Sequence, residues 1–209
     1  YPPEFIKSIA VKSKSNQVEF PVIRLGNSLS IEFDVLNGYE EDYYYKIDHY
    51  NFDWTKSQLS KSEYLKGYDN NKIYNYKNSF NTYQIYSHYN LSIPNDETKI
   101  IKSGNYIISI FDEYQEIVFS KKIIIYEALS NVKIGVFRTR DLNFIHKKQV
   151  VQFEIEAEKI NNPLKTIKTL IIQNNNLDQS ISNLKPQYTI GNKLIYKYDS
   201  PASFDGGNE

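Results

Sequence analysis

The sequence contains no cysteine and no methionine among its 209 residues. The absence of cysteine excludes disulfide bonds, thiol nucleophiles and thiolate metal ligands. Because the chain has no initiating methionine, we expect it to be a processed or trimmed product, either an exported protein after removal of its signal peptide or a shortened cytosolic protein. No apolar run approaches the roughly 20 residues that span a bilayer, so we expect no direct membrane insertion.

An excess of charge of either sign is also lacking. The chain has 25 basic and 25 acidic residues, so its formal net charge is zero. A nucleic-acid-binding protein normally carries a basic excess or a basic stripe, and we therefore expect no nucleic-acid partner. Hydrophobic residues make up 40% of the chain and aromatic residues 15%, which is enough apolar material for a globular protein to bury a core.

Residue types that usually build catalytic and metal sites are present but scattered. The three histidines, His49, His88 and His146, have no metal-ligand spacing. The chain has no G-x-S-x-G motif for a nucleophilic serine and no glycine-rich loop that could hold a phosphate. The histidines are therefore more typical of surface positions or the edge of a core than of a metal site.

The acidic clusters also give no indication of a catalytic or metal site. Residues 40–42 (EED) follow the turn signal Asn37-Gly38, and they are more typical of a solvated hairpin loop than of a calcium site, whose oxygens come from alternating positions. Glu154, Glu156 and Glu158 alternate along one strand and predict an exposed face with lysine neighbours. We therefore expect no enzymatic activity, no catalytic residue, no cofactor and no metal.

Apolar residues recur with the two-residue period of β-strands. Leu29, Ile31 and Phe33 alternate with polar neighbours, which predicts a half-buried strand. The only helix that we expect is a short turn around residues 57–65. Strand patterns predict further strands in this part of the chain at residues 5–11, 18–24, 43–48, 89–93, 106–111 and 117–126.

The strands fall into two groups. Those in residues 1–127 indicate an antiparallel β-sandwich of immunoglobulin-like type. Residues 128–131 mark a boundary, after which a second β-domain, 128–209, begins. We expect the chain to be all-β and this second domain to be truncated, or to borrow support from a partner. Its predicted strands are residues 132–136, 150–157, 167–173 and 194–198.

A long polar segment rich in aromatic residues covers residues 49–69 and continues through 75–95. Ordinary loops run to about 4–6 residues, and disordered segments are poor in aromatics, so this segment must pack on its own sheet or on a partner. The two alternatives are internal packing and a contact surface. Asp53 could hold the turn beside the single tryptophan. The candidate partner-binding residues are Trp54, Tyr64, Tyr68, Tyr74, Tyr76 and Phe80.

The first 127 residues resemble the first domain of the plug protein of the Bacteroidota type IX secretion system. The resemblance is carried by residues 21–26 (PVIRLG), 36–38 (LNG), 43–45 (YYY), 49–54 (HYNFDW), 60–64 (SKSEY), 78–82 (NSFNT) and 103–106 (SGNY). It implies a location in the periplasm, associated with the outer membrane, and a partner, the large translocon β-barrel that exports folded proteins. No catalytic residues come with it.

The resemblance also implies a function. A very wide barrel leaks unless it is closed, and the family is expected to act as a non-enzymatic plug that occludes the periplasmic opening of the idle channel. The alternative is a carbohydrate-binding or accessory β-sandwich module of a secreted glycan-degrading system. A sugar platform usually holds a few coplanar rings on one face, whereas a plug should spread its contacts over loops and edges.

Overall fold

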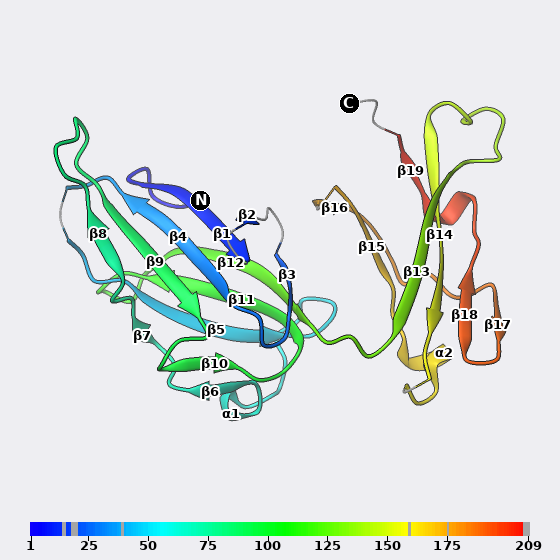
Figure 1. The fold of residues 1–209 in the computed structure, drawn as a ribbon, viewed down its shortest axis with the longest axis horizontal. Helices are drawn as coiled ribbons and strands as arrows, with labels where there is room; N and C mark the ends of the chain where they lie inside the picture. The colour runs from blue at the N-terminus through cyan, green and yellow to red at the C-terminus, as the bar shows by residue number, and fades with distance from the viewer. Residues whose placement is uncertain (14–15, 18–20, 39, 159, 175, 207–209) are drawn as a thin grey trace. The chain divides into compact units, whose positions relative to one another are not determined.

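The computed structural model describes residues 1–209 except 14–15, 18–20, 39, 159, 175 and 207–209. The chain divides into two compact units, Tyr1–Glu127 and Ala128–Glu209, and each consists mainly of β-strands (Figure 1). The predicted all-β class is confirmed. Among the described residues, no helix has the length and apolar character needed to cross a membrane.

The first unit contains a five-stranded antiparallel sheet with the order β2-β1-β4-β9-β8. Strand β4 shows why the sequence pattern is informative, because Leu29, Ile31 and Phe33 are buried while the residues between them are only partly covered. The strands are β1 (Ile6–Ser13), β2 (Asn16–Gln17), β4 (Leu29–Val35), β8 (Tyr76–Asn78) and β9 (Ser87–Ile93).

The second sheet of this unit has the order β3-β12-β11-β5-β7. One pair departs from the antiparallel prediction, because β3 runs parallel to β12. Only residues 22–24 of the predicted strand 18–24 form it, and 18–20 lie outside the described residues. The strands are β3 (Val22–Arg24), β5 (Tyr44–Tyr50), β7 (Asn71–Lys72), β11 (Gly104–Phe111) and β12 (Ile117–Tyr126).

The two sheets enclose one aromatic-rich core. Phe33 lies at its centre, with ring centroids 5.2 Å from Tyr89 and 5.2 Å from Phe119, which come from opposite sheets. The strand orders β1-β4-β9-β8 and β12-β11-β5 follow the A-B-E-D and G-F-C orders of an immunoglobulin-like domain. The hydroxyl of Tyr106, near the start of β11, donates to the carbonyl of Lys102 at 2.6 Å, as in the tyrosine corner of such domains.

A short helix and a two-stranded ribbon complete the first unit. The helix α1 (Lys61–Tyr64) falls inside the predicted turn at 57–65. Its start is fixed because the carboxylate of Glu63 accepts hydrogen bonds from the N–H (2.8 Å) and the hydroxyl (2.9 Å) of Ser60. The ribbon pairs β6 (Leu65–Gly67) with β10 (Thr98–Ile100), which the sequence pattern did not predict.

The second unit contains a sheet of order β13-β14-β18-β17, with β19 also paired to β14, and a separate hairpin of β15 and β16. Phe153 and Tyr196 stack in its core with centroids 4.2 Å apart. The elements are β13 (Asn131–Arg138), β14 (Lys148–Glu156), α2 (Pro163–Thr166), β15 (Leu170–Gln173), β16 (Asn176–Ser182), β17 (Tyr188–Ile190), β18 (Lys193–Tyr196), η1 (Ser200–Ala202) and β19 (Ser203–Asp205).

Four of these strands, β13, β14, β15 and β18, lie where the sequence predicts them. The helix α2 and the strands β16, β17 and β19 were not predicted. The residues of β17 are all exposed, and those of β19 are exposed or half-buried, so neither strand carries the alternation of buried and exposed side chains that identifies a strand in sequence.

Candidate interaction surface

The candidate aromatic residues differ sharply in exposure. Tyr64 is only 3% exposed, whereas Phe80 is 94% exposed. Tyr68 and Tyr74 are also well exposed, and Trp54 and Tyr76 are partly covered. The fold therefore does not bring these rings together on one surface.

Tyr64 belongs to the core rather than to a surface. Its ring centroid lies 5.4 Å from that of His49 and 6.0 Å from that of Tyr106. Burial lowers the pKa of His49, against the opposing effect of the Ser103 carbonyl, which faces Nε2 at 3.4 Å. Of the two alternatives, internal packing applies to Tyr64, and we therefore leave this residue out of the proposed contact surface.

Trp54 lies on a tight loop after β5. The backbone N–H of Asn51 donates to the carbonyl of Thr55 at 2.8 Å, and Trp54 itself adopts a positive φ of 61°. Asp53 holds this turn, because its Oδ1 accepts from the N–H (3.1 Å) and hydroxyl (2.6 Å) of Thr55. The ammonium of Lys122 sits 4.9 Å from the centre of the Trp54 ring, a cation–π contact.

The sequence 103–106 (SGNY) anchors the Trp54 loop to the sheet. The side-chain amide of Asn105 donates to the carbonyl of Asn51 at 2.9 Å and to that of Phe52 at 3.2 Å. Tyr106 is fully buried beside His49, its partner in the β5–β11 ladder. This part of the motif has a structural role, since it fixes the loop that carries Trp54.

Two of the most exposed rings lie on the loop of residues 79–86, which joins β8 to β9 and projects from the first unit at the upper left of Figure 1. It carries Phe80 together with Tyr83, which is fully exposed but was not among the candidate residues. The N–H of Ser79 donates to the carbonyl of Tyr86 at 2.8 Å, and Nε2 of Gln84 to that of Leu36 at 2.9 Å. The loop is thus held in shape by hydrogen bonds, not by burial of its rings.

Strand β8, which pairs with β9, is hydrogen-bonded to the acidic cluster at residues 40–42. Glu40 accepts hydrogen bonds from the hydroxyl of Tyr76 at 2.9 Å and from the amide of Asn78, and these bonds lower the pKa of its carboxyl group. Asp42 pairs with Lys72 at 2.7 Å. The carboxylates serve different partners, and the described residues contain no group of three or more side chains placed to hold a metal ion.

Tyr68 and Tyr74 flank β7 at another edge of the first unit. The ammonium of Lys72 lies 5.9 Å from the centre of the Tyr74 ring. An open groove of about 310 Å³ runs beside Tyr74, and its lining includes Asn75, Asn90, Asn95 and Asp96. Polar and apolar side chains both line this groove, and among the described residues no ring contact joins Tyr68, Tyr74, Phe80 and Tyr83 to one another.

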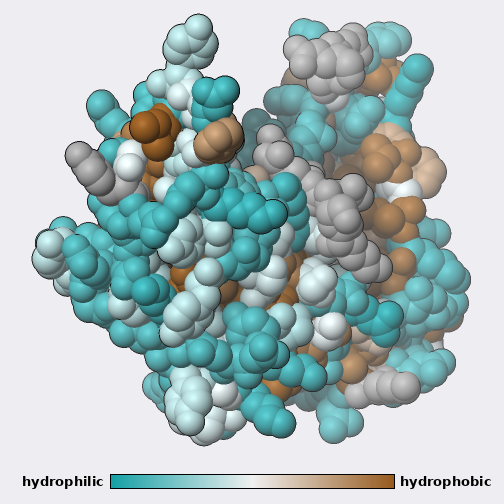
Figure 2. All heavy atoms as spheres, turned by 60° about the vertical axis from the view of Figure 1, so that its left-hand side comes forward, coloured by the Kyte–Doolittle hydropathy of each residue, from teal (hydrophilic) through white to brown (hydrophobic). Residues whose placement is uncertain are grey.

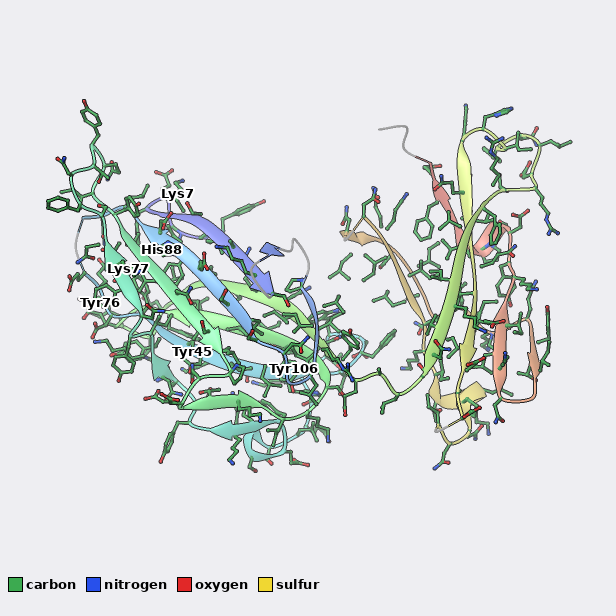
Figure 3. All side chains as sticks on the ribbon, in the orientation of Figure 1. Lys7, Tyr45, Tyr76, Lys77, His88 and Tyr106 are labelled. Atoms are coloured by element: carbon green, nitrogen blue, oxygen red, sulfur yellow. The ribbon has the colours of Figure 1, made fainter. Side chains whose placement is uncertain are left out.

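A row of charged residues crosses the first sheet on neighbouring strands. Lys7, Asp34, His88 and Lys77 stand opposite one another on β1, β4, β9 and β8, and Figure 3 labels three of them. Nδ1 of His88 lies 2.6 Å from Oδ1 of Asp34. We interpret this row as a solvated outer face, consistent with the mainly hydrophilic surface of Figure 2.

In the second unit, the predicted acidic face of β14 is confirmed for Glu154 and Glu156. Lys133 lies 3.1 Å from Glu154, and Lys193 lies 2.8 Å from Glu156. Each carboxylate thus has the predicted lysine neighbour on an adjacent strand, but both glutamates are half-buried rather than exposed.

These observations define a class: a protein of two β-units whose first unit has the strand order of an immunoglobulin-like domain and presents exposed aromatic side chains. Residues 6–127 match the family described as type 9 secretion system plug protein, 1st domain, and the chain belongs to this family. The predicted resemblance is confirmed. The family is one of secretion-system components and not of known enzymes, and it connects the chain with type IX secretion.

The fold of the whole chain has a counterpart in a solved structure. The crystal structure of a hypothetical protein from Parabacteroides merdae is 32% identical to this chain and superposes with a TM-score of 0.92. The match covers 100% of this chain and 54% of that one, so the chain spans about half the length of this relative. No curated protein matches the chain.

Proposed function

We propose that this chain is a non-enzymatic plug that occludes the periplasmic opening of the wide outer-membrane translocon barrel of the type IX secretion system while that channel is idle. The observation that carries the proposal is the match of residues 6–127 to the plug family. The proposal places the chain in the periplasm, associated with the outer membrane, with the barrel as its partner.

The first unit has a rigid core, as a plug for a wide channel requires. Its core contains fully buried Phe33, Tyr43, Tyr89 and Tyr106, and close-packed interiors of this kind resist deformation. A wide pore cannot be filled by its own side chains, so a rigid body must close it by shape.

The 79–86 loop supplies a contact that can be reversed. Exposed aromatic side chains are common interface anchors, and Phe80 and Tyr83 stand out from this loop among polar neighbours such as Asn81 and Thr82. A wholly apolar patch would promote aggregation of the released plug. Rings separated by polar residues allow both docking and release.

The experiment is a pull-down from a detergent extract of the cell envelope with the tagged chain. We expect recovery of a very large outer-membrane barrel, with the affinity reduced about 30-fold by Phe80→Ala or Tyr83→Ala, since truncation of an interface anchor costs roughly 2 kcal/mol. Tyr114→Ala is the matched control, because Tyr114 is an exposed ring on a different hairpin and should not matter.

A second arm of the same experiment addresses the carbohydrate-binding alternative. Retention of the chain on polysaccharide, abolished by Tyr74→Ala beside the groove, together with no recovery of a barrel, would replace the plug proposal.

A further inference from the structure

The strand β13 has an open edge. It pairs with β14 and, among the described strands, with no other. The N–H of Thr139 donates to the carbonyl of Lys148 at 3.3 Å, so Thr139 and every second residue before it on β13 form hydrogen bonds with β14. Because the direction of backbone groups alternates along a strand, the N–H and C=O groups of Val132, Ile134 and Val136 point away from β14.

The side chains of the same three residues lie on the core face of the sheet. Val132, Ile134 and Val136 stand directly opposite Ile155, Phe153 and Val151 of β14, and directly opposed residues share a face. The three residues of β14 are buried in the core of the second unit. Their partners on β13 are 51–65% exposed. No described part of the second unit therefore packs over the three side chains of β13 as it does over those of β14.

Along Val132, Ile134 and Val136 this face carries no charged side chain, and Arg138 follows only at its end, opposite Gln149. Lys133 lies on the opposite face, where its ammonium is 3.1 Å from Glu154. The ring of Phe137 also lies there, because a Cβ on Gly135 would be 2.7 Å from it. The part of the edge at Val132, Ile134 and Val136 therefore has neither a charged side chain on this face nor a bulge, and such an apolar edge is a site for pairing with another strand.

We propose that a β-strand of the same protein pairs with β13 and covers Val132, Ile134 and Val136. This strand would come from the portion that corresponds to the part of the Parabacteroides merdae chain with no counterpart here, 46% of that chain (100 − 54). Strand addition supplies partners for the outward backbone groups and an apolar cover for the side chains.

Two considerations favour the same polypeptide as the source of this strand. A covalently connected segment reaches the edge at a high effective concentration and therefore stays in place. The three aliphatic side chains follow one another on their face, with the polar pair Arg138 and Gln149 only at one end. Such an apolar row suits permanent burial better than a contact that forms and breaks. The proposal does not depend on the plug function.

The test uses the absence of cysteine from the chain. The substitution Ile134→Cys introduces a single thiol, whose rate of labelling by a maleimide is measured in the purified 209-residue chain and in the protein at its natural length in its own cells. We expect labelling at least tenfold slower at natural length. The matched control is Ile117→Cys, because Ile117 is 64% exposed against 65% for Ile134 and should label equally in both.

Every other outcome overturns the proposal. Equal labelling of the Ile134→Cys thiol in both forms means that the face is open. If the thiol is protected from labelling in cells but not in the purified natural-length protein, a separate partner covers β13. Concentration-dependent protection of the 209-residue chain, with a dimer in sedimentation, assigns it to a second copy.

Hydrogen exchange gives an independent readout on unmodified protein. In the 209-residue chain the amides of Val132, Ile134 and Val136 should exchange faster than those of Lys133 and Gly135. At natural length the first three should become protected. Fast exchange of these three amides in both forms would contradict strand addition even if the side chains were covered.

Discussion

The imidazole ring of His49 fills the space that a side chain at position 104 would need. A Cβ on Gly104 would lie 2.1 Å from Nε2 of His49, and Gly104 has a φ of +153°. Glycine is therefore required there by a neighbouring side chain as well as by the backbone. The contact ties the 103–106 motif to β5, next to the loop that carries Trp54.

We predict that Gly104→Ala destabilises the first unit by about 1–3 kcal/mol, because the added methyl group must displace a buried ring. Denaturant unfolding measures the change. Gly26→Ala is the control, since Gly26 has a φ of +90° but no atom within 4 Å of an added Cβ, so only backbone strain applies. Equal losses for the two variants would show that the His49 contact does not matter.

We also predict that the first unit loses stability as the pH falls below about 6.5, the usual pKa of histidine. Burial lowers the pKa of folded His49, so the unfolded chain binds a proton first, and stability declines until the lower folded pKa is reached. The carboxyl groups of Glu40 and Glu63, whose pKa values are lowered from 4.5, respond only at lower pH.

Urea unfolding at pH 7.5 and 5.5 measures this effect. The variant His49→Gln should lose less stability between the two pH values than the unmodified chain. The control His146→Gln changes an exposed histidine of the second unit and should leave the pH dependence of the first unit as it was. The same loss in all three proteins would remove His49 as the cause.

Strands with a buried and an exposed face could be predicted from the sequence because alternation is a local property. Leu29, Ile31 and Phe33 of β4 are an example. The short strand β8 could not be predicted, since its three residues are all exposed and its place is set by pairing with β9. The parallel pairing of β3 with β12 likewise depends on contacts between distant residues.

The candidate surface was predictable as a segment but not residue by residue. Tyr64 and Tyr68 are four positions apart with similar polar neighbours, yet the first is buried and the second exposed. The difference arises because α1 turns Tyr64 onto His49 and Tyr106. Tyr83, among the most exposed rings, gave no sequence signal that set it apart from the other tyrosines of the segment.

The difference in burial between Tyr64 and Tyr68 gives a third prediction. Tyr64→Ala should cost about 3–5 kcal/mol of stability, as for other large buried aromatic residues. Tyr68→Ala should change stability by no more than about 0.5 kcal/mol, because its side chain is exposed. Thermal and denaturant unfolding measure both. A large loss for Tyr68→Ala would mean that its ring packs on the fold in solution.

The last prediction concerns Asn105, whose amide donates to the carbonyls of Asn51 and Phe52. Asn105→Ala removes both hydrogen bonds of this buried side chain and should cost about 1–3 kcal/mol, from about 0.5–1.5 kcal/mol for each bond. The loop should also loosen, so that Trp54 moves away from Lys122 and becomes more exposed to water.

Trp54 is the only tryptophan in the chain, so its fluorescence reports on this loop alone. In Asn105→Ala we expect emission shifted to longer wavelength and stronger quenching by acrylamide under native conditions. Asn131→Ala is the control, because the amide of Asn131 binds Glu156 at an exposed site of the second unit. Unchanged emission with lost stability would show that Asn105 supports the sheet but does not hold the loop.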